Sequence, residues 1–147
     1  MAPDGVVIEK YQGVGALPHF NDPEQAPDPV LSFRASIREA DAVLICTSEY
    51  AFGVPGSLKN ALDWTVSSGE FIDKPVGLIT ASSQGEKGHA ALLLTLQAIS
   101  AKVISGSCLI ISFVRSKLDT DGHIKDPAVA LDVRRALAAL LDAVPAR

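Results

Sequence analysis

The hydrophobic residues of this chain are concentrated in short runs that polar, turn-forming segments separate. Residues 42–47 and 75–80 are almost continuously apolar, a pattern typical of strands that are buried on both faces of a parallel sheet. Residues 102–113 form two strand-like halves, 102–105 and 108–113, around a break at Gly106. The short β-branched run at residues 6–9 predicts another strand beside residues 42–47, which gives a sheet of at least four strands.

Segments with helical spacing lie between these runs. Residues 30–40 repeat apolar side chains at helical intervals, and Asp28 before Pro29 has the character of an N-cap followed by a first-turn proline. The remaining predicted elements are helices at residues 56–67, 90–101 and 126–144 and a loop at residues 11–29. This alternation predicts an α/β fold with three layers, in which helices cover both faces of a parallel sheet.

Two loops, residues 48–56 and 81–88, leave predicted strands at their carboxyl ends. Both are rich in glycine, serine and other small residues. Ligands of open α/β sheets bind at this edge, where glycine lets backbone N–H groups approach closely and helix starts favour negative charge. An ordinary strand-to-helix turn explains either loop alone equally well, but two adjacent loops of this kind favour a binding site.

The motifs in these loops resemble those of the NAD(P)H-dependent FMN reductase family. The sequences "EYAFGVPGSLKNALDW" (residues 49–64) and "KPVGLITASSQGEKGHAALLLTLQAISAKVI" (residues 74–104) carry the resemblance, which extends from about Leu17 to the carboxyl terminus. That family has the flavodoxin-like fold and includes quinone, chromate and azo-dye reductases. The resemblance therefore implies an oxidoreductase that passes hydride from NADPH or NADH through FMN to a small acceptor.

By this resemblance, the two loops hold the flavin ring, mainly through backbone groups. The implied cofactor-binding residues are Ser48, Glu49, Tyr50, Ala51, Phe52 and Gly53 in the first loop and Ser82, Ser83, Gln84 and Gly85 in the second. Because the flavin carries the redox chemistry, we expect no catalytic acid–base pair, no nucleophile and no metal.

The amino-terminal part departs from the pattern of the family. Relatives begin with an apolar strand, a phosphate-binding loop and a helix, whereas here the first residues lead directly into residues 6–9, the expected second strand. Without that loop, about three charge-assisted hydrogen bonds to the phosphate of FMN would be lost, which would weaken FMN binding by about 4–9 kcal/mol. We therefore expect weak FMN binding and a preference over riboflavin of less than about tenfold. A smaller departure is Ala51, where many relatives have asparagine.

This departure leaves two pairs of alternatives open. Either residues 6–9 move inward to pair with residues 42–47, or the sequence is a piece of a longer protein. For function, the alternative to the oxidoreductase is a flavin-free relative that acts as a binding or assembly subunit. The retained loop motifs favour the oxidoreductase. The departure from the family pattern in the amino-terminal part favours the flavin-free relative.

Composition narrows the class of protein. The 147 residues are 48% hydrophobic, which suits a single domain, residues 1–147, with one core. A net charge of −4 argues against nucleic-acid or membrane-surface partners. Cys46 and Cys108 lie in apolar runs and are expected to be buried thiols, which fits a reducing, cytoplasmic location. No signal peptide or membrane-spanning run is recognised.

The resemblance also implies assembly. Family members form dimers or tetramers, so we expect a homo-oligomer whose contact includes residues 56–67 and 68–71. Lys59 and Asp63 have the spacing of a helical ion pair, and Trp64 and Phe71 are expected in a core or a dimer contact rather than in a stacking platform.

The histidines and one acidic loop complete the candidate chemistry. His19 and His123 are expected to be surface residues, and His89 is expected to have a surface role at the start of a helix. Asp119 and Asp121 resemble the start of a calcium loop, but the bidentate glutamate is absent, so this segment is interpreted as a turn before the last helix.

Overall fold

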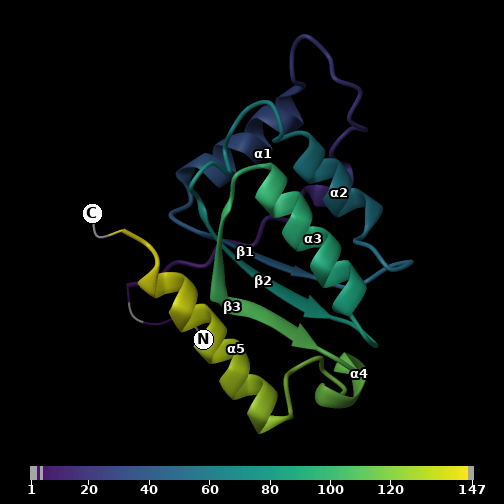
Figure 1. Cartoon of the computed structure of the whole chain (residues 1–147), viewed down its shortest axis with the longest axis vertical. Coiled ribbons are helices and arrows are strands. Elements are labelled where there is room, and N and C mark those ends of the chain that lie inside the picture. The colour runs from purple at the N-terminus through teal and green to yellow at the C-terminus, as the bar shows by residue number, and fades with distance from the viewer. Residues whose placement is uncertain (1–2, 4, 146–147) are drawn as a thin grey trace.

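A parallel sheet forms the middle of the molecule (Figure 1). The computed structural model describes residue 3 and residues 5–145. Strands β1 (Val43–Thr47), β2 (Pro75–Ala81) and β3 (Lys102–Ile111) pair in parallel in the order β1-β2-β3. The predicted α/β class with a flavodoxin-like arrangement is confirmed.

Among the described residues, four longer helices lie before, between and after the strands as the sequence predicts, and two short helices were not predicted. Their bounds are η1 (Val14–Ala16), α1 (Asp28–Glu39), α2 (Gly56–Asp63), α3 (Glu86–Ala98), α4 (Val114–Lys117) and α5 (Pro127–Asp142). Helix α1 begins at Asp28 and its N-cap is Pro27, so the expectation of Asp28 as the N-cap is wrong by one residue. Asp126 caps α5, because its carboxylate accepts hydrogen bonds from the backbone N–H groups of Ala128 and Val129.

The larger apolar core lies between one face of the sheet and helices α1, α2 and α3. Val76 and Leu78 point to this face, where fully buried side chains such as Val30 of α1 and Leu92 of α3 cover them. Trp64 and Phe71 belong to the core, with 1% and 2% of their surface exposed. Of the two expected places for these side chains, a core or a dimer contact, the structure shows the core.

Helix α5 packs on the opposite face. Gly77 and Ile79 alternate with the residues of the first face, and α5 contacts β3 and β2 but has no comparable contact with β1. Gly106 of β3 allows a close approach, because a Cβ there would lie 3.0 Å from the Cβ of Ala139 in α5. Helix α5 therefore covers only the β2–β3 half of its face.

The break that Gly106 suggested is a bulge within a single strand. Val76 pairs with Val103 and Leu78 pairs with Cys108, so Gly77 alone stands opposite residues 104–107 of β3. Ser107 turns inward at this bulge and is fully buried, and its hydroxyl has no hydrogen-bond partner among the described residues.

The predicted strand at residues 6–9 is wrong, and with it the prediction of at least four strands. This segment is irregular, and the side chains of Val7 and Ile8 are 84% and 60% exposed. In the described part of the chain, β1 pairs only with β2. The prediction assumed that the outer edge of β1 is buried, where unpaired backbone groups are costly. An edge open to solvent avoids that cost, so β-branched composition alone does not make a strand of residues 6–9.

The same open edge overturns the expectation of β1 as a doubly buried strand. Ile45 faces the larger core, but Leu44 is 40% exposed and Cys46 is exposed on the face that α5 leaves uncovered. Cys108 is half-buried, and burial raises the pKa of its thiol. The expectation of two buried thiols is therefore wrong for Cys46.

Two smaller details of α2 differ as well. The helix ends at Asp63 instead of residue 67, and Val66, which lies within the predicted helix, is 62% exposed in the following turn. Lys59 and Asp63 form the expected ion pair, with 2.5 Å between Nζ and Oδ1.

Candidate active site

A cleft opens where the chain leaves the carboxyl ends of the three strands. Its volume is about 660 Å³, within the range of small-molecule sites. The residues that line it are Ser48, Glu49 and Tyr50 after β1, Ala81, Ser82 and Ser83 after β2, and Phe113, Val114, Arg115 and Ser116 after β3. The edge of the sheet at which the sequence placed a site therefore does carry a cleft.

The first loop, residues 48–56, contains a tight two-residue turn. Tyr50 and Gly53 exchange two backbone hydrogen bonds, 3.0 and 2.8 Å long. Ala51 and Phe52 between them both have positive φ, +46° and +61°, as in the hairpin turns that normally take Asn and Gly. Side chains disfavour this conformation, and such strain is concentrated at functional sites. The N–H groups of Tyr50 and Gly53 are therefore used within the turn.

The second loop ends in a glycine that the backbone requires. Gly85, the N-cap of α3, has φ +105°, a conformation that other residues rarely adopt. This geometry turns the chain from the end of β2 directly into α3, which begins four residues earlier than the pattern of apolar residues indicated.

The two loops are joined by contacts at Gly88. Its backbone N–H donates a hydrogen bond of 2.7 Å to Oε2 of Glu49. A Cβ on Gly88 would lie 2.6 Å from the carbonyl oxygen of Gly53, so only glycine fits without movement. Nearby, the Lys87 ammonium lies 3.6 Å from the centre of the Phe52 ring. Glu49 thus connects the loops, and its carboxylate is already engaged.

His89 anchors the start of α3 to the end of β2, so the expectation of a surface role is wrong. Its side chain is 7% exposed, and Nδ1 lies 2.8 Å from the hydroxyl oxygen of Thr80. Burial lowers the pKa of His89, because it disfavours the charged form of the ring. A period-3.6 apolar pattern does not show a buried polar pair of this kind.

The third loop is a part of the cleft that sequence reasoning missed. Phe113 and Val114 donate backbone hydrogen bonds of 3.2 and 3.1 Å to the carbonyl oxygens of Ser83 and Ser82. Phe113 has φ +53°, which turns the chain sharply into α4. The available signal was topological, because the strand after β2 in a parallel sheet ends at the same edge.

The structure divides the ten predicted residues into two groups. Five line the cleft: Ser48, Glu49, Tyr50, Ser82 and Ser83. The other five do not line it; they are Ala51 and Phe52 at the tip of the first turn, Gly53 beside Gly88, and Gln84 and Gly85 before α3.

Exposed aromatic rings surround this cleft. Tyr50 and Phe113 line it and are 64% and 68% exposed, and Phe52 at the neighbouring turn is 62% exposed. Large exposed rings in one place indicate a binding surface, and flat rings suit a planar aromatic ligand. Within the described residues, the hydroxyls of Ser82 and Ser83 have no protein partner, so they are available to a ligand with polar edges. These aromatic rings and hydroxyl groups together fit the ring of a flavin.

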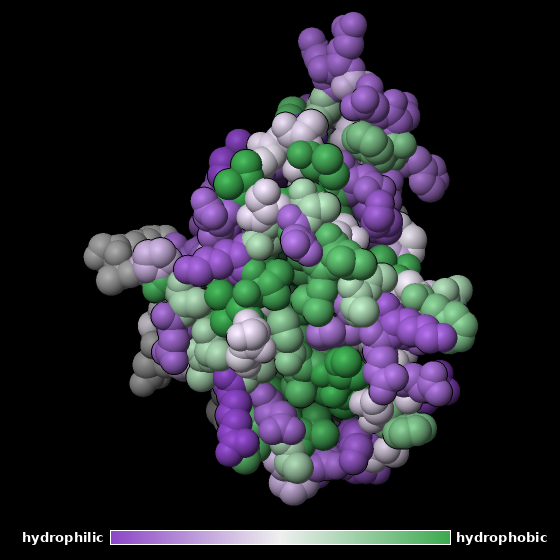
Figure 2. Space-filling model, viewed as in Figure 1, coloured by the Kyte–Doolittle hydropathy of each residue, from purple (hydrophilic) through white to green (hydrophobic). Residues whose placement is uncertain are grey.

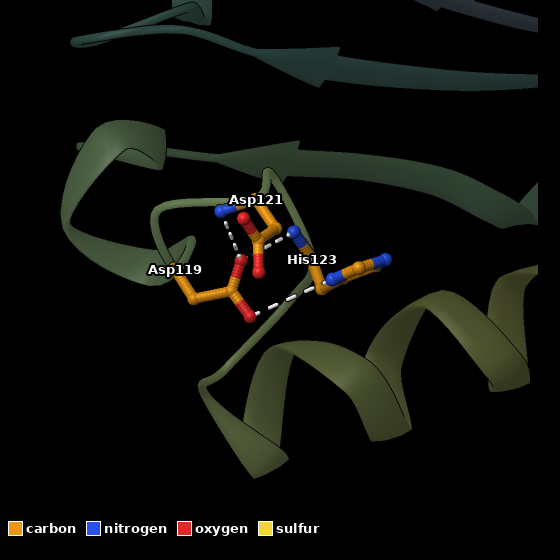
Figure 3. A group of neighbouring side chains, drawn as sticks. All are labelled: Asp119, Asp121 and His123. Carbon is orange, nitrogen blue, oxygen red and sulfur yellow. Dashed lines mark hydrogen bonds and ion pairs between the residues drawn. The ribbon is translucent and has the colours of Figure 1, made fainter.

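A separate acidic group lies in the turn between α4 and α5 (Figure 3). Oδ1 of Asp119 accepts hydrogen bonds from the backbone N–H groups of Asp121 and His123, at 3.0 and 2.8 Å. The ligand atoms of the three side chains lie within 4.8 Å of one another, but all three residues are exposed. These hydrogen bonds account for the arrangement as a turn, which is the interpretation from the sequence. His123 and His19 are exposed, as expected.

Comparison with known proteins identifies the family of this chain. The model of a family described as NADPH-dependent FMN reductase matches residues 4–115. The chain belongs to this family. Membership identifies it as an oxidoreductase that works with FMN and a nicotinamide nucleotide, as the loop motifs implied.

Several individual FMN reductase relatives are similar over much of the chain. An NAD(P)H-dependent FMN reductase of Pseudomonas aeruginosa is 32% identical over 95% of this chain and 80% of its own length. Subunit 2 of an NADH-dependent flavin reductase of Lactobacillus johnsonii is 30% identical, over 79% of this chain and 68% of its own length. A quinone reductase of Escherichia coli is 35% identical over 61% of this chain, which spans about half of that relative.

A solved structure supports the same assignment to the FMN reductase family. The flavoenzyme FerB of Paracoccus denitrificans, an NAD(P)H:acceptor oxidoreductase, superposes with a TM-score of 0.78 at 29% identity. The match covers 89% of this chain and 76% of FerB. In the part of the chain that the structure describes, no helix has the length and apolar character needed to cross a membrane.

Proposed function

We propose that this chain binds FMN in the cleft at the carboxyl ends of β1, β2 and β3 and reduces quinones or similar small acceptors with NADPH or NADH. The observation that carries the proposal is the cleft itself, where loops from three strands bring exposed aromatic rings next to unpartnered serine hydroxyls. When bound, FMN supplies the hydride chemistry.

The residues of the chain place and surround the ring. Tyr50 and Phe113 offer apolar contact, and the hydroxyls of Ser82 and Ser83 can donate hydrogen bonds to the polar edge of a flavin. Glu49 serves to hold the loops together through Gly88, so it is not assigned the role of a general base. The flavin-free alternative receives no support from the relatives, whose names describe reductases.

Finer features of the same proposal concern location and assembly. We propose a cytoplasmic homodimer or homotetramer whose contact includes α2 and residues 68–71. Val66 and Ile72, on either side of residues 68–71, are 62% and 60% exposed. Figure 2 shows further apolar surface in the middle of the viewed face, where α3 lies. Such a surface favours burial against a second subunit, and sedimentation showing only monomer at micromolar concentration would contradict it.

The test is to titrate FMN and riboflavin into the purified protein and to follow flavin fluorescence. We expect an FMN dissociation constant in the micromolar-to-millimolar range and a preference over riboflavin of less than about tenfold. Replacing both Ser82 and Ser83 by alanine should weaken the binding of both flavins about tenfold or more, since each hydrogen bond contributes about 0.5–1.5 kcal/mol. Ser57→Ala, at an exposed position of α2, is the matched control.

Activity is the second part of this test. NADPH or NADH oxidation should depend on added FMN and on a quinone, and should fall in the double serine variant but not in Ser57→Ala. Protein that binds neither flavin, or a double variant with unchanged affinity for both, would contradict the proposed site.

A further inference from the structure

Among the residues that line the cleft, Arg115 has a charged side chain that forms no ion pair with another described residue. It is exposed in α4 and lines the cleft, where the other charged lining residue is Glu49. Within the described residues, no carboxylate lies within 4.0 Å of its guanidinium. An arginine fork without an acidic partner, facing a cleft, is suited to bind phosphate.

Neighbouring charged groups are engaged, in contrast to Arg115. Lys117, two residues later in the same helix, lies 2.7 Å from Oδ2 of Asp126. Lys87 lies over the Phe52 ring, and the carboxylate of Glu49 accepts the N–H of Gly88. The chain has a net charge of −4. Arg115 therefore differs from the neighbouring charged residues, because it is a cation that lines the cleft without an ion-pair partner.

Hydrogen bonds on both sides of Arg115 hold its backbone in place. The residues just before it donate the hydrogen bonds to Ser82 and Ser83 that join the second and third loops. The hydroxyl of Ser116 adds a 2.8 Å bond to the carbonyl oxygen of Phe113, and that of Ser112 adds a 3.1 Å bond to Gln84. The arginine thus starts from the same hydrogen-bonded frame that carries the serines of the proposed flavin site.

We infer that Arg115 gives this cleft its affinity for a phosphate group of a nucleotide ligand. The inference rests on the proposed function and names the chemistry that its ligands must share. Two ligands could supply that phosphate: FMN, through its terminal phosphate, and the nicotinamide nucleotide, through its diphosphate. Because the guanidinium is exposed, its contribution is limited to about twofold to fivefold in affinity at low ionic strength.

The experiment compares three variants of the whole chain. Arg115→Gln removes the charge but keeps hydrogen-bond donors, and Arg115→Lys restores the charge. Lys102→Gln removes one positive charge at the opposite end of β3 and controls for net charge. Each protein is titrated with FMN, riboflavin and NADP⁺ at about 0.01 M and about 1 M salt, where the screening length falls from about 30 Å to about 3 Å.

We expect Arg115→Gln to weaken the binding of a phosphate-bearing ligand by about twofold to fivefold at low salt and to leave the binding of riboflavin unchanged. Arg115→Lys should recover most of the loss, and the difference between wild type and Arg115→Gln should shrink at high salt, which a purely structural role would not produce. A loss confined to FMN identifies its phosphate as the partner, and a loss confined to NADP⁺ identifies a phosphate group of the nicotinamide nucleotide.

A second measurement does not depend on flavin binding. Inorganic pyrophosphate is titrated into ¹⁵N-labelled protein, and the amide shifts of Ser82, Ser83 and Ser116 are followed. We expect shifts in the wild type and in Lys102→Gln that Arg115→Gln loses. Unchanged ligand affinities together with pyrophosphate shifts that persist in Arg115→Gln would overturn the inference while leaving the flavin site standing. A wild type that binds no flavin would refute the proposed function, and the pyrophosphate shifts would then decide the role of Arg115.

Discussion

Replacing Gly88 by alanine tests how tightly the first two loops at the carboxyl edge of the sheet are joined. The added Cβ would lie 2.6 Å from the carbonyl oxygen of Gly53, whereas ordinary contacts begin at 3.4 Å, so the first loop must retreat by about 0.8 Å. It would also lie 3.0 Å from Cγ of Glu49, whose carboxylate accepts the Gly88 N–H. The methyl group therefore pushes apart the two sides of the cleft.

Two effects on stability oppose each other in this variant. Overpacking of this kind costs about 1–3 kcal/mol, while alanine is favoured over glycine inside a helix by about 1 kcal/mol. The expected net loss in the free energy of unfolding is about 0–2 kcal/mol, small enough for the protein to fold. Flavin affinity should fall by about tenfold or more, because displacements near 1 Å at a binding site are costly.

The control is Gly56→Ala in the first turn of α2, where an added Cβ meets no atom within 4 Å. Denaturant unfolding and flavin titration are measured for both variants. Gly56→Ala should be neutral or slightly stabilising, with unchanged flavin affinity. If Gly88→Ala proves as stable as Gly56→Ala and binds flavin as well as the wild type, the close junction of the loops does not set the shape of the cleft.

Three further predictions concern stability. Because burial lowers the folded-state pKa of His89, its contribution to stability is complete above the unfolded pKa of about 6.5 and is lost as pH falls through the folded-state value; His89→Gln should flatten the decline of stability below pH ~6.5, and a decline equal to that of the wild type would contradict this reasoning. Replacing Ala51 and Phe52 by Asn and Gly should raise the free energy of unfolding by about 1–3 kcal/mol, because both have positive φ; unchanged denaturant midpoints would count against strain in the turn. Ser107→Ala should stabilise the fold by up to about 1 kcal/mol by removing a buried hydroxyl without a described partner, and a destabilised variant would show that the hydroxyl is satisfied.

Elements whose residues carry their own signal could be predicted from the sequence. The apolar runs that became β1 and β2 lie within one residue of their observed bounds, and Asp126 followed by Pro127 marked the start of α5. The loop motifs identified the family and half of the residues that line the cleft. These features depend on local pattern and on short motifs, which a single sequence contains.

Features that depend on distant parts of the chain could not be predicted in this way. Whether residues 6–9 form a strand depends on a partner across space, and the exposure of Cys46 depends on how far α5 extends over the sheet. His89 became a buried residue because Thr80 offers it a hydrogen bond. Arg115 reached the cleft through backbone hydrogen bonds to a loop about thirty residues earlier in the chain.

The most direct test of the central claim is to map FMN binding on ¹⁵N-labelled protein by amide chemical shifts. The account predicts that the largest shifts fall on Tyr50, Ser82, Ser83 and residues 113–116, which line the cleft. The amide shift of Lys102, at the opposite end of β3, should stay unchanged. Shifts centred away from the three strand ends, or none at millimolar FMN, would contradict the claim that this cleft is the flavin site.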